Sequence, residues 1–447
     1  MFSGITARRF ARKVLTGTAF ILCLITGSAL LNTAAKAELL MLSGGPHAGP
    51  YLGVGIGTGS LTGRQFNATA TEDVQGFGAS DFQVVPVAGW KVSFIDMFVF
   101  GLETHISLAT ILSQRTDADT SSINMKRPFE YGVTGLAGYL VNNDGLLFGQ
   151  GGYSRARTII LDGPKTDING WIYGAGAETI VGDSISFRIN WKHTLFEDPA
   201  TTATNDEFEV AQDQFLFSLI YRFGGNESTG PRAGSNELKH GFQISASPGR
   251  SAGVMAESLE GAGSGQNDLQ SDGYLASFAI SYDFTLPNDR FVLGIGGSYS
   301  IADIEYENIT DTLNAKVEQE NDLQFFGRFG FKPTPSSMIY SDIGWTRGDI
   351  EVSRGGTAGG IQSPGTARAT SVELEAKGLM LGLGMRLATD IDGMFVDVNW
   401  QYVRYETDGV EFGNSAPFTT ATQDISSNRF TIGVGYSLSG ILSKAFY

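Results

Sequence analysis

Hydrophobic and polar residues alternate with a period of two along much of this chain. The clearest stretch is Gln214–Phe223, and Arg429–Leu438 repeats the pattern near the C-terminus. Their apolar positions are Phe215, Phe217, Leu219, Tyr221 and Phe223 in the first stretch, and Phe430, Ile432, Val434, Tyr436 and Leu438 in the second. Alternation over about ten residues predicts a β-strand with one apolar face. Each stretch is read as the closing strand of one half of the chain.

The pattern predicts eight strands in each half. In the first half they are 51–62, 82–94, 98–111, 129–141, 145–157, 169–181, 184–196 and 212–223, and in the second half 242–249, 274–284, 291–304, 322–332, 338–350, 372–388, 394–405 and 429–438. Tight turns such as 142–144 alternate with long polar connections such as 197–211. Short turns at one end and long loops at the other are typical of a transmembrane barrel, whose apolar face contacts lipid.

The predicted fold is therefore all-β, a transmembrane antiparallel up-and-down β-barrel. Two tandem eight-stranded barrels are one arrangement, and one sixteen-stranded barrel is the alternative. The 18-residue connection between Phe223 and Phe242 and the glycines on inward faces favour two barrels. Eight strands leave room only for side chains, whereas sixteen leave an aqueous channel. The expected domains are 38–224 and 242–447, joined by a periplasmic linker over 225–241.

The N-terminus has the pattern of a secretory signal over residues 1–37. Arg8, Arg9, Arg12 and Lys13 precede an apolar run, and Ala35-Lys36-Ala37 is a small-x-small cleavage sequence. We expect cleavage near Ala37. The part that follows has no apolar run long enough for a membrane-spanning helix. It also has no cysteine, because Cys23 lies within the signal.

Charged residues at inward positions are the candidate site. They are Glu103, His105, Glu130, Glu178, Arg188, Lys192 and Arg222 in the first half, and Asp283, Arg328, Asp342, Arg386 and Asp397 in the second. Their mixed signs predict a network of ion pairs inside the barrel. Glu103 with His105 could in principle bind a metal, but such inward polar pairs are common in barrels.

Neither catalysis nor a cofactor is expected. The four histidines do not assemble with serine and an acid into a recognisable catalytic set. We therefore predict no enzyme activity, no cofactor and no metal. The formal net charge of −16 also argues against nucleic acid as a partner, which would require a basic surface.

Several motifs in the first half resemble those of a known family. They are GYLVNNDGLLFGQGGYSRAR (138–157), NGWIYGAGAETIVGDSISFRINWKHTLF (169–196) and FLFSLIYRF (215–223). They are similar to the opacity-protein-like, OmpA-like "porin family" of outer-membrane β-barrels. The second half departs more, because it closes on Tyr-Ser-Leu rather than Tyr-Arg-Phe.

The resemblance implies the outer membrane of a Gram-negative bacterium as the location. It implies contact with outer-membrane lipid and lipopolysaccharide, and insertion by periplasmic chaperones and the barrel-assembly machinery. Surface ligands would bind through the external loops. The expected function is structural and surface-interacting, in envelope integrity and adhesion. The alternative is a sixteen-stranded general diffusion porin for small solutes, in which residues 250–273 would fold into the pore.

Overall fold

The computed structural model describes residues 45–66, 74–94, 97–116, 122–160, 165–197, 207–223, 236–259, 266–309, 314–355, 370–406 and 421–438. Within these ranges the chain forms sixteen strands. They are β1 (Gly49–Phe66), β2 (Val74–Phe94), β3 (Phe98–Thr116), β4 (Ser122–Leu140), β5 (Gly145–Ile160), β6 (Lys165–Gly182), β7 (Ile185–Phe196), β8 (Glu207–Arg222), β9 (Gly241–Leu259), β10 (Gln266–Thr285), β11 (Phe291–Ile309), β12 (Asn314–Thr334), β13 (Ser337–Gly355), β14 (Thr370–Ala388), β15 (Met394–Glu406) and β16 (Ala421–Ser437).

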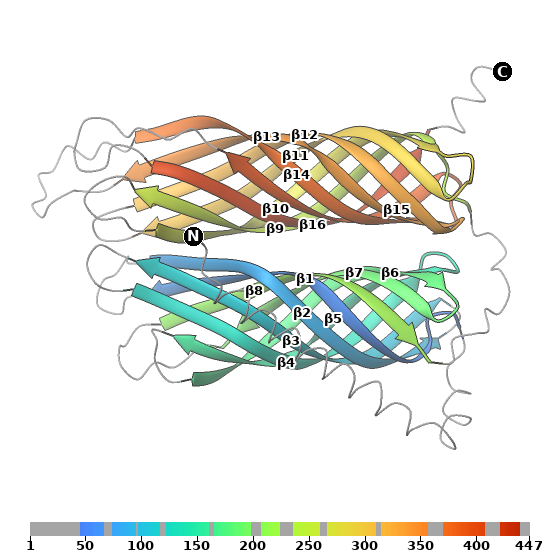
Figure 1. The fold of residues 1–447 in the computed structure, drawn as a ribbon, viewed down its shortest axis with the longest axis horizontal. Helices are drawn as coiled ribbons and strands as arrows, with labels where there is room; N and C mark the ends of the chain where they lie inside the picture. The colour runs from blue at the N-terminus through green and yellow to red at the C-terminus, as the bar shows by residue number, and fades with distance from the viewer. Residues whose placement is uncertain are drawn as a thin grey trace, which may run out of the picture.

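These strands close into two separate barrels. Consecutive strands pair antiparallel within β1–β8 and within β9–β16. Strand β1 closes the first set on β8, and β16 closes the second on β9. The barrels lie side by side (Figure 1). Two single ladder contacts join them, Arg115 with Asn267 and Val74 with Ile309. The prediction of two tandem eight-stranded barrels is confirmed, and the sixteen-stranded alternative is wrong.

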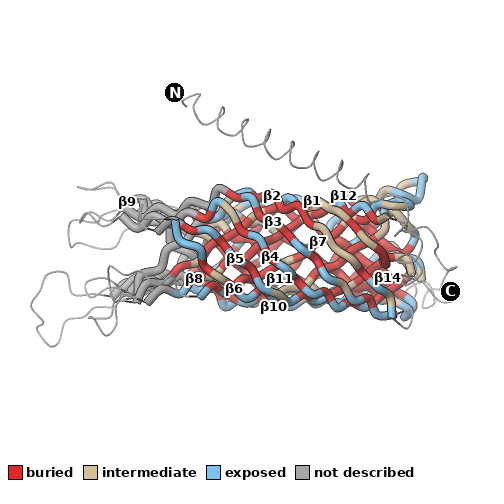
Figure 2. Tube along the Cα trace, turned by 90° about the horizontal axis from the view of Figure 1, so that it is seen from below, coloured by how far each residue is buried: buried red, intermediate tan, exposed pale blue. Residues whose placement is uncertain are grey.

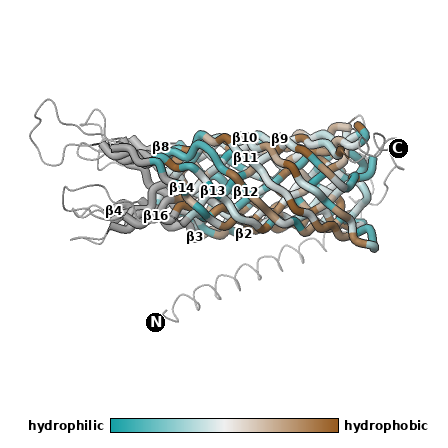
Figure 3. The backbone as a smooth tube through the Cα atoms, turned by 90° about the horizontal axis from the view of Figure 1, so that it is seen from above, coloured by the Kyte–Doolittle hydropathy of each residue, from teal (hydrophilic) through white to brown (hydrophobic). Residues whose placement is uncertain are grey.

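Buried and exposed positions alternate along the strands (Figure 2). On β4, for example, Tyr131 and Val133 face outward and are 47% and 45% exposed, whereas Thr134 faces the lumen and is fully buried. Large apolar side chains remain exposed on the outside, as Leu379 and Ile343 do. Figure 3 shows hydrophobic and hydrophilic positions interleaved along the strands. An apolar outer wall of this kind is suited to contact with lipid.

All strands except β7 run further than the alternation predicts. The strands have 12 residues in β7 and up to 21 in β2 and β12, whereas about 9–11 residues cross a bilayer. Residues 250–273 are a particular correction, because most of them belong to β9 and β10 and do not form a pore loop. Beyond the membrane the outer face meets water, so it no longer needs apolar residues and the alternation fades.

The two barrels touch along a seam formed by outward-facing side chains. It comprises Val141, Ala177, Ile189, Phe215, Ala252, Met385, Leu387, Val396, Val398, Trp400 and Phe430. Phe217 packs edge-to-face on Trp400 with ring centroids 5.1 Å apart, and Trp191 stacks on Phe430 at 6.2 Å. Barrel strands are tilted, so a straight line of contact crosses several strands of each barrel.

Each predicted closing strand lies partly in the seam and partly outside it. Phe215 and Phe430 are buried against the other barrel, while Leu219, Tyr221 and Val434 stay exposed. The remaining positions are partly buried: Phe217, Phe223, Ile432, Tyr436 and Leu438. A closing strand therefore presents one apolar face to both the partner barrel and the lipid.

Polar groups also cross the seam. Asn142 donates to the Ala388 carbonyl at 2.8 Å, and Thr58 donates to Asn428 at 3.0 Å. Near the loop end, Arg250 contacts Asp213 at 3.2 Å. These pairs satisfy outward polar groups that lipid could not, and they define how the barrels are aligned.

Other predictions fall outside the described residues. The signal sequence 1–37 lies there, as do most of the predicted linker and the tail 439–447. In the described part of the chain, no helix is long and apolar enough to cross a membrane.

Candidate functional site

The structure places all twelve predicted site residues inside the barrels, where each is buried. The connections β2–β3, β4–β5, β6–β7, β10–β11, β12–β13 and β14–β15 are short and lie at one end, which we call the turn end. The opposite end is the loop end. In each barrel the charged residues form one cluster near the turn end and a second one nearer the loop end.

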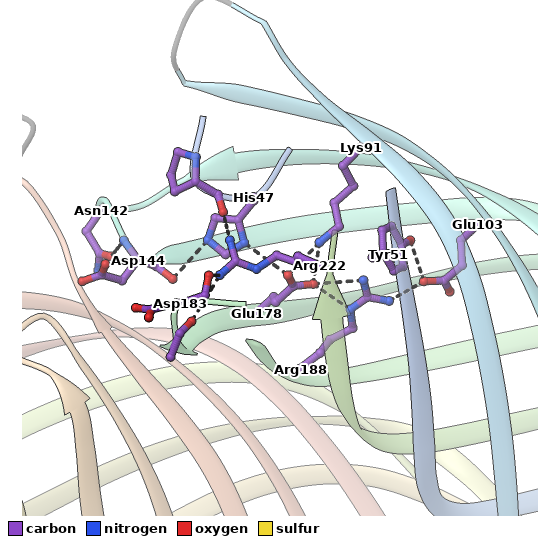
Figure 4. Close-up of polar contacts among 12 residues, drawn as sticks. His47, Tyr51, Lys91, Glu103, Asn142, Asp144, Glu178, Asp183, Arg188 and Arg222 are labelled. Atoms are coloured by element: carbon purple, nitrogen blue, oxygen red, sulfur yellow. Dashed lines mark hydrogen bonds and ion pairs between the residues drawn. The ribbon is translucent and has the colours of Figure 1, made fainter. Parts of the chain in front are cut away.

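Arg188 is the centre of the turn-end cluster of the first barrel (Figure 4). Its guanidinium bridges two carboxylates, contacting Glu103 at 2.5 Å and Glu178 at 2.9 Å. Lys91 adds a 2.7 Å contact to Glu178, and the Tyr51 hydroxyl donates to Glu103 at 2.8 Å. Glu178 on β6 and Arg188 on β7 are direct cross-strand partners, so the sheet register itself sets their distance.

The segment before β1 closes the turn-end mouth of this barrel. His47 is buried, and its ring lies 3.2 Å from Glu178 and 3.1 Å from the Asp144 carbonyl. Arg222 donates to the Pro46 carbonyl and to the Asp183 carbonyl at 3.1 Å. Burial lowers the pKa of His47 below the ordinary value of a histidine. Burial therefore favours the neutral ring, which forms part of a polar plug.

A second cluster lies nearer the loop end of the first barrel. Arg127 contacts Glu130 at 2.8 Å, and Gln214 donates to the same carboxylate at 3.1 Å. His105 approaches Glu130 only to 4.0 Å. Lys192 lies between the two clusters and reaches Glu103 at 3.6 Å. Together these side chains fill the lumen from the turn end toward the loop end.

The second barrel repeats the turn-end device with other residues. Arg386 bridges Asp397 at 3.0 Å and Asp283 at 2.8 Å. The Tyr340 hydroxyl donates to Asp397 at 2.5 Å. Arg328 forms a two-pronged pair with Asp342, with both contacts at 2.8 Å. Paired nitrogen and oxygen contacts of this kind are among the stronger charge-assisted hydrogen bonds.

Nearer the loop end, Asp322 accepts several donors. Arg429 and Thr346 contact it, and the Tyr405 hydroxyl donates to it at 3.0 Å. Gln319 donates in turn to the Tyr405 oxygen at 2.8 Å. Apolar side chains such as Met380 pack around this cluster.

The turn-end mouth of the second barrel is closed by an apolar group. Leu238 is buried among Val292, Met338, Tyr340, Ala388 and Phe395. Its amide donates to the Pro335 carbonyl at 3.0 Å, and Asn236 donates to the Thr389 carbonyl at 3.0 Å. The sequence had assigned these residues to the linker, but the last part of that segment plugs the second barrel.

The charged side chains of each lumen neutralise one another and fill the space inside the barrel. A cavity of about 40 Å³ remains inside the second barrel, beside Arg386 and Asp397, which is room for a few water molecules. Among the described residues, no group of three or more side chains is arranged to hold a metal ion. Glu103 and His105 are instead directed to separate neighbours, Arg188 and Glu130.

Several residues of these clusters were missed from the sequence. Arg127 would point outward by simple alternation, but a bulge between Lys126 and Phe129 turns it inward. Lys91 lies within β2, directly after the stretch Val84–Trp90, which is apolar on both faces, so its direction was ambiguous. Tyr51 shares its parity with the inward Gly53, and that parity was the available signal.

The match to a known protein family agrees with this geometry. The family model described as "Outer membrane protein beta-barrel domain" matches residues 20–223 and again residues 233–437. The chain belongs to this outer-membrane β-barrel family. Both halves match, so the resemblance seen in the first half is confirmed and holds for the second half as well. No curated protein matches the chain.

Three solved structures are similar to the chain at low identity and low TM-score. Neisserial surface protein A (NspA) is 14% identical over 44% of this chain and 96% of its own, with a TM-score of 0.24. Ail, the attachment invasion locus protein of Yersinia pestis, is 14% identical over 44% of this chain and 99% of its own, with a TM-score of 0.23. A Pseudomonas aeruginosa FadL homologue is 11% identical over 87% of this chain and 90% of its own, with a TM-score of 0.28.

Proposed function

We propose that this chain is a structural and surface-interacting protein of the outer membrane of a Gram-negative bacterium, acting in envelope integrity and adhesion. The observation that carries the proposal is that both lumens are filled. Arg188 and Arg386 each lie across the lumen between two carboxylates, and each turn-end mouth is plugged. Eight strands leave no room for a channel besides these side chains.

The strands that project past the membrane supply the surface. On the outer wall of the second barrel the side chains of Asp349, Glu351, Glu373 and Glu375 gather toward the loop end. On the first barrel, Arg155 and Arg157 pair with Asp167 on the neighbouring strand. A long charged wall above the lipid is suited to contact with other surfaces, and its role would add to that of the loops.

Partners and processing are part of the same proposal. We expect lipid and lipopolysaccharide around the barrels, delivery by periplasmic chaperones and the barrel-assembly machinery, and cleavage near Ala37. We expect no catalysis. The hydrogen-bonded His193 and Asp213 are enclosed at the seam, where Asp213 also accepts from Trp191 at 2.7 Å.

A deletion strain tests this function. Loss of the chain should raise sensitivity to detergent and lower attachment to coated surfaces, and the intact gene should restore both. A variant with Asp349, Glu351, Glu373 and Glu375 changed to Asn or Gln should restore detergent resistance but not attachment. Unchanged resistance and unchanged attachment in the deletion strain would refute the proposal.

A further inference from the structure

An apolar crevice of about 420 Å³ lies where the outer wall of the first barrel meets β16 of the second. Its floor is a row of small residues, Ala137, Gly149 and Ala175, which are successive cross-strand partners on β4, β5 and β6. Phe100, opposite Ala137, bounds the row at one end. Ile432 of the second barrel forms the facing wall.

The space above the floor of the crevice is not filled by protein atoms. A methyl group added to Gly149 would meet no neighbouring atom nearer than 3.9 Å. The crevice is lined almost entirely by apolar groups, so water there would find few hydrogen-bond partners. An empty gap would also forfeit dispersion contacts on every lining side chain. Something apolar is therefore expected to fill it.

The depth of the crevice identifies the leaflet. Phe98 begins β3 directly after a short turn, and Tyr139 lies just before the turn at 141–144. Both line the crevice. In an outer-membrane barrel the short turns face the periplasm. The crevice therefore lies in the periplasm-facing leaflet, which consists of phospholipid, and not in the leaflet of lipopolysaccharide.

The crevice is continuous with the seam on one side and with the bilayer on the other. Along β16, Phe430 is buried in the seam, Ile432 borders the crevice, and Val434 is 49% exposed. Val434 and Tyr436 then border a second apolar groove, of about 700 Å³, on the wall of the second barrel. Two grooves thus lie on either side of one stretch of β16.

We propose that a phospholipid of the periplasm-facing leaflet binds here as a structural lipid, with one acyl chain in the crevice and the other in the neighbouring groove. The lipid extends the seam beyond the direct contacts between the barrels. Its two chains match the two grooves, and its leaflet matches their depth. The site rests on the membrane-spanning fold and is independent of the adhesive role.

Native mass spectrometry of the full chain, extracted in a mild detergent, tests the proposal. The wild type should retain one phospholipid per chain. Ala137→Phe and Gly149→Phe fill the floor and should weaken retention about tenfold, equivalent to about 1.4 kcal/mol of binding free energy. Ile343→Phe is the matched control, because Ile343 faces outward on β13, is 70% exposed and borders neither groove.

Folding is checked in each variant by the shift in gel migration on boiling. Ile432→Ala removes one wall without adding bulk, so it should lower retention even if the larger side chains disturb the sheet. The proposal is overturned if the wild type retains no lipid, if it retains lipopolysaccharide or a second chain instead, or if Ile343→Phe loses lipid equally.

Discussion

The two barrels neutralise their lumens with the same device in opposite order. In the first barrel the acid Glu178 lies on the sixth strand and the base Arg188 directly opposite on the seventh. In the second, the base Arg386 lies on the sixth strand and the acid Asp397 opposite on the seventh. Each arginine also reaches a second carboxylate, and in each cluster a tyrosine hydroxyl donates to one of the acids.

The different strand positions of the charges show which property of the lumen is required. The second carboxylate is Glu103 on the third strand of one barrel and Asp283 on the second strand of the other. The strand that carries each charge can therefore change. What stays is an arginine between two carboxylates, because a charge buried without its partner is strongly destabilising.

The plugs at the turn ends differ in kind. His47 closes the first barrel through hydrogen bonds, whereas Leu238 closes the second through apolar packing. A polar plug matches a mouth lined by Glu178 and Arg222, and an apolar plug matches one lined by Met338 and Phe395. The two halves thus reach the same closed state by different interactions.

Removal of the central arginine should have the largest effect in either barrel. Arg188→Ala or Arg386→Ala leaves two buried carboxylates without their shared cation, so we expect each to lower the free energy of unfolding by about 3–5 kcal/mol. Urea unfolding followed by gel migration measures it. Arg155→Ala, at an exposed pair, is the control and should change little. A loss below about 1 kcal/mol in both lumen variants would contradict the shared device.

Truncation of the apolar plug should come next. Leu238→Ala removes a buried side chain, 6% exposed, and we expect a loss of about 2–3 kcal/mol in the unfolding free energy. The same urea titration detects it. Leu379→Ala, at a side chain 71% exposed on the outer wall, should cost less because few protein contacts are lost. Equal losses in the two variants would show that Leu238 does not act as a plug.

The tyrosine hydroxyls should rank below the plug. Tyr51→Phe removes a donor to a carboxylate, and we expect about 1.5–2 kcal/mol. Tyr340→Phe should cost more, because its oxygen also accepts from Asn399 at 3.0 Å. Comparing the two variants by urea midpoint sharpens the contrast between barrels. A larger loss at Tyr51 than at Tyr340 would reverse the inferred order.

Acidification should give the smallest effect and should act on the polar plug. Burial lowers the pKa of His47, so below the ordinary histidine value of about 6.5 the unfolded chain binds more protons than the folded one. Stability should therefore fall as the pH decreases from about 6.5 toward the lowered pKa. His47→Gln should flatten this dependence between pH 7.5 and 5. An unchanged slope of stability against pH in this variant would show that His47 does not cause the pH dependence.

Much of the fold could be predicted from alternation alone, since inward and outward faces follow directly from a period of two. Alternation did not determine the number of barrels, because closure depends on which distant strands pair; the long connection between Phe223 and Phe242 and the inward glycines favoured two. The strand ends were also hidden, since alternation fades where the outer wall meets water. Bulges break the rule locally, as at Arg127.

The seam was the other feature that periodicity could not predict. Trp191, Phe215 and Trp400 resemble lipid-facing residues in sequence, yet they pack against the other barrel. Asp213 was the residue that could have indicated the seam in the sequence, because a carboxylate at an outward position of a closing strand cannot face lipid. Its partner Arg250 lies 37 residues away on β9, beyond the reach of a local pattern.

Conductance of the purified full-length chain in planar bilayers tests the central claim most directly. Two closed eight-stranded barrels with filled lumens should give no steady channel current, and Arg188→Ala with Arg386→Ala should not open a large pore. A stable, porin-sized conductance from the folded wild type would contradict the account of two closed lumens.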